Sequence, residues 1–257
     1  MKNTTKKKLT SVSVFHYIRL VYRSLLFIAI VTVYVLARIY KKDINEIINE
    51  YPYVFIPIWC VFAFEMVFRF FPSKIESPGC QKQFKKNYIK SGNTDIKVSD
   101  NHATVLVLIV WISANLIIGA LYNLKIIDTG IMIILSSAYS IGDMVCILFF
   151  CPFQTWFLKN KCCTTCRIYN WDYAMMFTPF IFVRSFYTWS LVAMSLILFL
   201  RWEITYYVHP ERFSENTNEC LKCENCNEKL CAHKEQLKTL WNTISKETQE
   251  RIKKLKK

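Results

Sequence analysis

The chain has 257 residues, of which 53% are apolar and 16% aromatic, and its mean hydropathy is +0.20. A soluble domain is usually about 45–50% apolar, and here the excess lies in long blocks that predict membrane-spanning helices. The formal net charge of +14 lies mostly between these blocks and at the two ends, which indicates contact with anionic lipid headgroups. We exclude a nucleic-acid interface, because the charges flank apolar runs and are not interleaved with aromatic residues on one surface.

Residues 1–23 form a basic N-terminal segment. Its first 13 residues are expected to be disordered or to lie on lipid headgroups, and residues 16–23 could be the interfacial start of the first span. The apolar run behind it is long and ends in Arg38, Lys41 and Lys42. This pattern predicts a retained membrane anchor and not a cleaved signal peptide.

The apolar blocks predict an all-α protein: a multi-span integral membrane helical bundle over residues 24–208 with about five spans. The predicted spans are residues 24–40, 53–71, 103–124, 131–151 and 186–200. Between the first two, isoleucines at helical spacing indicate a short amphipathic helix on the surface. Asp128 or Thr129 could cap the fourth span. The stretch 173–208 is too long for one straight span and too short for two with a turn, so we expect an interfacial half-helix to about Val183 before the last span.

The orientation of the chain is in conflict with the span count. The charge rule places the N-terminus and the basic loop 73–102 in the cytoplasm. Five spans then put the C-terminal tail outside, although the tail is as basic as the segments inside. Either the last stretch is re-entrant or interfacial, or one earlier segment does not span, or the tail is outside.

Residues 209–257 form a Cys-rich tail that ends in a polar, basic helix, which could bind a lipid surface or a protein partner. Cysteines at two-residue gaps bring thiolates together as zinc or an iron–sulfur cluster requires. The predicted ligands are Cys220, Cys223, Cys226 and Cys231, with His233 as a further nitrogen ligand. Disulfides and unliganded thiols are the alternatives for this segment.

A second group of thiols, Cys162, Cys163 and Cys166, precedes the last apolar stretch. Its C-x-x-C spacing serves a redox dithiol or half of a zinc site. Adjacent cysteines at a membrane face are also palmitoylation sites. If both groups share one side of the membrane, they supply enough ligands for two metal sites.

Four charged residues lie inside or between apolar runs: Glu65, Arg69, Asp143 and Arg184. Such groups are costly in lipid when unpaired, and they mark pathways or proton relays. The alternative is internal neutralisation, with Glu65 paired to Arg69 along one helix and Asp143 paired to Arg184 between helices.

These patterns leave three functional hypotheses open. The first is a membrane protein with a thiolate metal site, zinc or iron–sulfur, that serves redox transfer or metal-stabilised partner docking. The second is a transporter or channel whose path is lined by the buried charges, with structural thiols. The third is a membrane scaffold or assembly factor. The sequence contains no phosphate-binding loop, metalloprotease motif or serine-nucleophile motif, so no enzymatic reaction is predicted.

Overall fold

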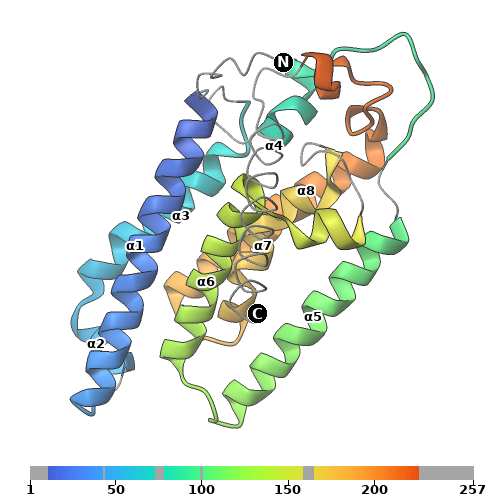
Figure 1. The fold of residues 1–257 in the computed structure, drawn as a ribbon. Helices are drawn as coiled ribbons and strands as arrows, with labels where there is room; N and C mark the ends of the chain where they lie inside the picture. The colour runs from blue at the N-terminus through green and yellow to red at the C-terminus, as the bar shows by residue number, and fades with distance from the viewer. Residues whose placement is uncertain (1–10, 43, 73–77, 99–100, 159–164, 226–257) are drawn as a thin grey trace, which may run out of the picture.

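The computed structural model describes residues 11–42, 44–72, 78–98, 101–158 and 165–225. This described part is all-helical and contains no strand. Its long helices pack side by side along a common axis (Figure 1). The all-α prediction is therefore confirmed for these residues.

Among the described residues, four helices are long and apolar enough to cross a membrane. They are α1 (Ser11–Ile39), α5 (Asn101–Asn123), α6 (Thr129–Leu148) and α8 (Phe186–Val208). A fifth helix, α3 (Pro52–Phe68), occupies the place of the second predicted span and is shorter. Length and composition thus indicate a membrane protein.

Two helices extend beyond their predicted limits. Helix α1 begins at Ser11 and not near residue 24, because an apolar face continues through exposed Val14, Ile18 and Val21. The polar residues between them are buried inside the bundle, so residues 16–23, the possible interfacial start of the first span, belong to this helix. Helix α8 continues to Val208, past the predicted end at residue 200.

Short elements connect and cover these helices. The helix α2 (Ile44–Glu50) occupies the predicted amphipathic segment. The remaining elements are α4 (Pro78–Gln83), η1 (Lys85–Asn87), the π-helical turn η2 (Phe153–Phe157), η4 (Arg167–Trp171), α7 (Asp172–Phe177), η5 (Thr178–Ile181), η6 (Pro210–Arg212), η7 (Glu219–Leu221) and η8 (Cys223–Asn225).

The start of α6 is fixed by a predicted cap. Asp128 is the N-cap residue, and its side chain accepts a hydrogen bond from the backbone N–H of Ile131 at 2.9 Å. Asp128 also forms an ion pair with Arg38 at 2.7 Å, which ties the ends of α1 and α6 together. Close packing follows at Gly130, where an added Cβ would lie 2.4 Å from the ring of Tyr34.

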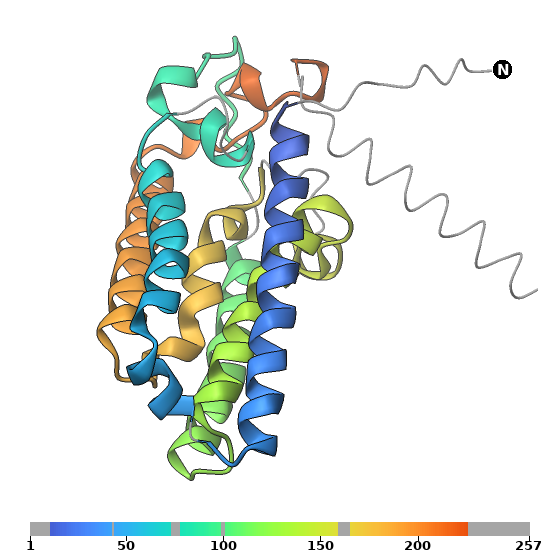
Figure 2. The ribbon, with the colours of Figure 1, turned by 90° about the vertical axis from the view of Figure 1, so that its left-hand side faces the viewer.

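The path of the chain brings the start of α1 and the last described residues to the same end of the bundle (Figures 1 and 2). Figures 1 and 2 show that α1 starts at the same end of the bundle as residues 210–225, which we call the N-terminal end. Helices α1 and α5 run away from this end, and α3, α6 and α8 run toward it (Figure 2). Residues 172–185 supply the additional descending segment before α8 rises (Figure 2).

Hydrogen bonds confirm this placement of residues 210–225. Backbone bonds of 2.9 Å join Ser91 N–H to the Thr217 carbonyl and Glu219 N–H to the Ile89 carbonyl. The described part of the tail therefore lies against the loop between α3 and α5. The first of the three solutions to the orientation conflict agrees with this geometry, because the descending segment returns the chain to the N-terminal end.

The descending segment lies inside the bundle and not at an interface. Tyr173, Met176 and Phe177 of α7 are each no more than 2% exposed. They pack with Phe62 of α3 and Leu191 of α8 in the larger apolar core. The expected half-helix therefore exists, but its predicted interfacial position is wrong, because its apolar residues fill the centre of the bundle.

Candidate functional site

One face of α1 carries polar residues into the centre of the bundle. His16, Arg19 and Arg23 recur at helical spacing and point the same way. The side chains of Arg19 and Arg23 are only 2% and 1% exposed. The sequence indicates that these arginines share a face, but their burial was not predicted.

Glu65 on α3 is the acceptor for these α1 side chains. Arg19 Nε lies 3.0 Å from Glu65 Oε1, and Arg23 Nη2 lies 2.8 Å from Glu65 Oε2. The hydroxyls of Tyr22 and Tyr173 donate to the same carboxylate at 2.7 and 2.9 Å. Glu65 thus joins three elements, α1, α3 and α7, through one carboxylate.

Two further carboxylates complete a buried charge network. Arg23 Nη1 lies 3.2 Å from Asp143 Oδ2 on α6, so Arg23 bridges two acids. Arg69 binds Asp172 of α7 with both nitrogens of its fork, at 2.8 and 2.5 Å. The ion pairs of the described residues in this network join the arginines Arg19, Arg23 and Arg69 to the acids Glu65, Asp143 and Asp172. The charges balance, which offsets the cost of removing each ion from water.

Burial raises the pKa of Asp172, the acid of this network that lies in the short helix α7. The pKa of the Asp172 carboxyl is raised because burial disfavours its charged form. The guanidinium of Arg69 acts in the opposite direction. Desolvation therefore favours the neutral form of Asp172, whereas the ion pair with Arg69 favours its charged form.

The structure corrects the predicted partners of the buried charges. Glu65 pairs with the arginines of α1, whereas Arg69, at the C-terminal end of α3, pairs with Asp172. Asp143 pairs with Arg23 and not with Arg184, which is exposed. The prediction of internal neutralisation is correct in kind, but its partners come from helices that the spacing within one helix could not reveal.

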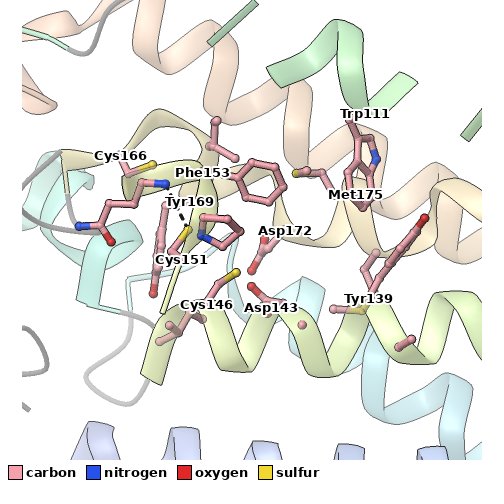
Figure 3. A pocket seen from close by; sticks show the side chains of 17 residues that line it. Trp111, Tyr139, Asp143, Cys146, Cys151, Phe153, Cys166, Tyr169, Asp172 and Met175 are labelled. Atoms are coloured by element: carbon pink, nitrogen blue, oxygen red, sulfur yellow. Dashed lines mark hydrogen bonds between the residues drawn. The ribbon is translucent and has the colours of Figure 1, made fainter. Parts of the chain in front are cut away.

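A first cavity, cavity 1, reaches the network between α5, α6 and α7. Its volume is about 280 Å³. Figure 3 shows that the carboxylates of Asp143 and Asp172 point toward one another across it. Aromatic residues Trp111, Tyr139, Phe153 and Tyr169 line the same space, and no described residue in its wall is Lys, Arg or His.

A second cavity, cavity 2, lies between α1, α3, α6, η5 and α8 and has a volume of about 480 Å³. Arg184 is the one charged residue among the described residues of its wall. Six serine and threonine residues also line it: Thr129, Ser136, Ser137, Ser140, Ser185 and Thr188. Met176, which is 1% exposed, lines both cavities. Arg23 donates to the backbone carbonyl of Ser140 at 3.1 Å, so the network also contacts the wall of cavity 2.

A separate ion pair holds the segment after the first thiol group. Arg167 of η4 pairs with Glu203 of α8 and donates to Tyr207 at 2.9 Å. Trp171 Nε1 donates to Glu203 at 2.6 Å, and Asn101 accepts from Arg167 at 2.9 Å. Burial alone would lower the pKa of Arg167, but its hydrogen bonds with Glu203 and Tyr207 raise it above its usual value. This arrangement fixes η4, which lies beside cavity 1, against α5 and α8.

The structure describes three of the predicted metal ligands, Cys166, Cys220 and Cys223. Cys166 is buried in the wall of cavity 1, and Cys220 donates from its thiol to the carbonyl of Asn87 at 3.0 Å at the N-terminal end. Cys223 begins η8. The other predicted ligands, Cys162, Cys163, Cys226, Cys231 and His233, lie outside the described residues.

Within the described ranges, no group of three or more His, Cys, Asp or Glu side chains could hold a metal ion. Most of the predicted thiolate ligands fall beyond those ranges. The zinc or iron–sulfur site therefore stays a prediction, which elemental analysis and thiol counting of anaerobically purified protein would test. Stoichiometric metal with protected thiols would support it, whereas metal-free protein with reactive thiols would contradict it.

Comparisons with protein-family models, with curated proteins and with solved structures find no match for this chain.

Proposed function

We propose that the chain is a multi-pass membrane carrier or channel for a cation, in which the buried charge network closes the path between cavity 1 and cavity 2. The observation that carries the proposal is the position of this network. Asp143 and Asp172 line cavity 1, and Arg23 contacts the wall of cavity 2 through the Ser140 carbonyl. Ionised groups inside apolar helices are expensive and are typical of conduction paths.

Arg23 supplies a means of opening. It binds Asp143 on α6 and Glu65 on α3 at the same time. A proton or other cation that neutralises Asp143 weakens one of these ion pairs and leaves Glu65 as the remaining partner. Such a ligand shifts the balance between two arrangements of α6 only by its difference in affinity for them. A carrier of this kind couples cation binding in cavity 1 to movement of α6 against α1.

Arg184 belongs to the same proposal in a different role from the one predicted. It lies on the wall of cavity 2 among hydroxyl groups and away from the carboxylates. We propose that its positive charge discourages cations from entering cavity 2 while the network is closed. The thiols of Cys146, Cys151 and Cys166 line cavity 1 and have a packing role in this proposal.

The proposal is tested by flux into liposomes that contain the purified full-length protein. Proton entry is followed with an internal pH indicator, and choline entry with labelled choline, both under an imposed inside-negative potential. We expect at least one flux to exceed that of empty liposomes by about tenfold or more. Asp143→Asn and Glu65→Gln should abolish this excess while the protein stays folded by circular dichroism.

Asp128→Asn is the matched control, because Asp128 is an acid outside the network and Asn remains a good N-cap. It should keep the wild-type flux. Wild-type liposomes that pass neither cation faster than empty liposomes would contradict the proposal. Folded Asp143→Asn protein with full flux would remove the network from the path.

A further inference from the structure

We infer that cavity 1 is a binding site for a small organic ammonium ion, held between the Asp143 and Asp172 carboxylates and the rings of Trp111, Tyr139 and Phe153. This inference names a substrate class for the site and rests on the proposed function only in treating cavity 1 as part of the path. Figure 3 shows the two carboxylates directed toward one another and these rings around the same space.

The charge of the wall selects a cation. The charge network as a whole is balanced, but its arginines do not line cavity 1 and two of its acids do. Arg23 contacts Asp143 through Oδ2. Both the ion pair and the hydrogen bond between Arg23 and Asp143 use this one oxygen, and Asp143 also lines the cavity. A cation that enters cavity 1 therefore meets negative charge without meeting Lys, Arg or His from the described residues.

The aromatic residues select an organic cation. Trp111 and Tyr139 have ring centroids 4.7 Å apart at an interplanar angle of 54°, and Trp111 and Phe153 have centroids 6.4 Å apart at 75°. Inclined rings present faces in different directions around one space. Ring faces attract ammonium groups that carry apolar substituents, and Trp is the strongest of them. A hard divalent cation such as Mg²⁺ or Ca²⁺ would instead require about six to eight oxygen ligands, which the largely apolar wall does not supply.

The volume of cavity 1 and the fixed position of Trp111 indicate a site for a small ligand. The volume of about 280 Å³ lies just below the usual range for ligand pockets, roughly 300–1,000 Å³, so the ligand must be small. The indole of Trp111 is held in place, because its Nε1 donates to Thr178 Oγ1 of η5 at 3.2 Å. A preformed aromatic wall lowers the ordering cost of binding.

The inference is tested by calorimetric titration of the purified full-length protein with choline and with dimethylbutanol, its uncharged carbon isostere. We expect choline to bind and the isostere to bind at least tenfold more weakly. Asp143→Asn and Trp111→Leu should each weaken choline binding about tenfold. Because Trp111 lies outside the charge network, Trp111→Leu still tests the inference if Asp143→Asn fails to fold.

Asp128→Asn and Trp156→Leu are the matched controls, since both residues lie outside the wall of cavity 1 and Trp156 is 67% exposed. Both should bind choline as the wild type does. Equal binding of choline and the isostere, absent choline binding, or unchanged affinity in Trp111→Leu would each overturn the inference. Choline binding without flux would support the site and reject the carrier, whereas proton flux without choline binding would do the reverse.

Discussion

At the scale of single residues, the buried arginines show what a sequence can and cannot indicate. Arg23 contacts acids that are 42 and 120 positions away in the chain. Helical spacing shows that Arg19 and Arg23 share a face, and apolar surroundings mark Glu65 and Asp143 as buried. Spacing within one helix carries no information about which helix lies opposite, so the partners could not be predicted.

The ion pair of Arg69 with Asp172 provides the first prediction. Both side chains are at most 5% exposed, so Arg69→Met leaves a buried carboxylate without its cation. We expect a loss of about 3–5 kcal/mol in the free energy of unfolding, measured by denaturant titration in detergent. Combining Arg69→Met with Asp172→Leu should recover much of this loss, because the unpaired charge is removed.

Arg38→Met is the matched control for this prediction. Arg38 also forms an ion pair, with Asp128, but its side chain is 63% exposed. An exposed pair contributes at most about 1 kcal/mol, so this variant should unfold almost as the wild type does. Equal losses for Arg38→Met and Arg69→Met would contradict the importance of burial.

At the scale of elements, the sequence predicted the long helices better than the segment between α6 and α8. Apolar blocks and the Asp128 cap mark the helices, since both are local signals. The segment containing α7 and η5 is short and interrupted by Pro179. Its apolar residues fit an interface and a protein interior equally well, and only the packing of Tyr173 and Met176 against other helices decides between them.

The contact between α5 and η5 provides the second prediction. A Cβ added at Gly119 would lie 2.2 Å from the ring of Phe182, so the ring or the helix must move. We expect Gly119→Ala to lower the free energy of unfolding by about 1–3 kcal/mol, as overpacking does. Thermal unfolding in detergent measures the change.

Gly142→Ala is the matched control on a neighbouring helix. Nothing lies within 4 Å of a Cβ placed at Gly142. Alanine has the higher helix propensity, by about 1 kcal/mol, so Gly142→Ala should be neutral or stabilising. A Gly119→Ala protein that is as stable as Gly142→Ala would show that α5 does not pack closely on Phe182.

At the scale of the whole molecule, the described tail and the loop between α3 and α5 share one end of the bundle (Figure 1). The charge rule favoured this result, whereas the count of five spans opposed it. The count of five spans leaves out residues 172–185, which descend through the bundle without forming a long apolar helix of their own. Charge distribution is a property of whole connecting segments, so a prediction based on it does not depend on any single element.

Sidedness provides the third prediction. We expect a protease site inserted at Asp95 and another at Glu224 to be cleaved from the same side of sealed membrane vesicles. A site inserted at Lys125, at the opposite end of the bundle, should be protected under the same conditions. The charge rule predicts that the accessible side of Asp95 is the cytoplasmic side. Cleavage at Glu224 together with Lys125, and not with Asp95, would contradict the arrangement.

The hydrogen bonds between residues 89–91 and residues 217–219 couple the described part of the tail mechanically to the loop between α3 and α5. Further hydrogen bonds join residues 82–97 to residues 214–220. Lys97 N–H donates to Ser214 Oγ at 3.0 Å, Asn218 donates to the Lys82 carbonyl at 3.0 Å, Ser91 Oγ donates to the Asn216 carbonyl, and the Cys220 thiol donates to the Asn87 carbonyl at 3.0 Å. An ion or a protein that binds the cysteine-rich tail and displaces it would therefore also displace the connection between α3 and α5. Those helices carry Glu65 and Trp111. A displacement of the tail would therefore be transmitted to both the charge network and the wall of cavity 1.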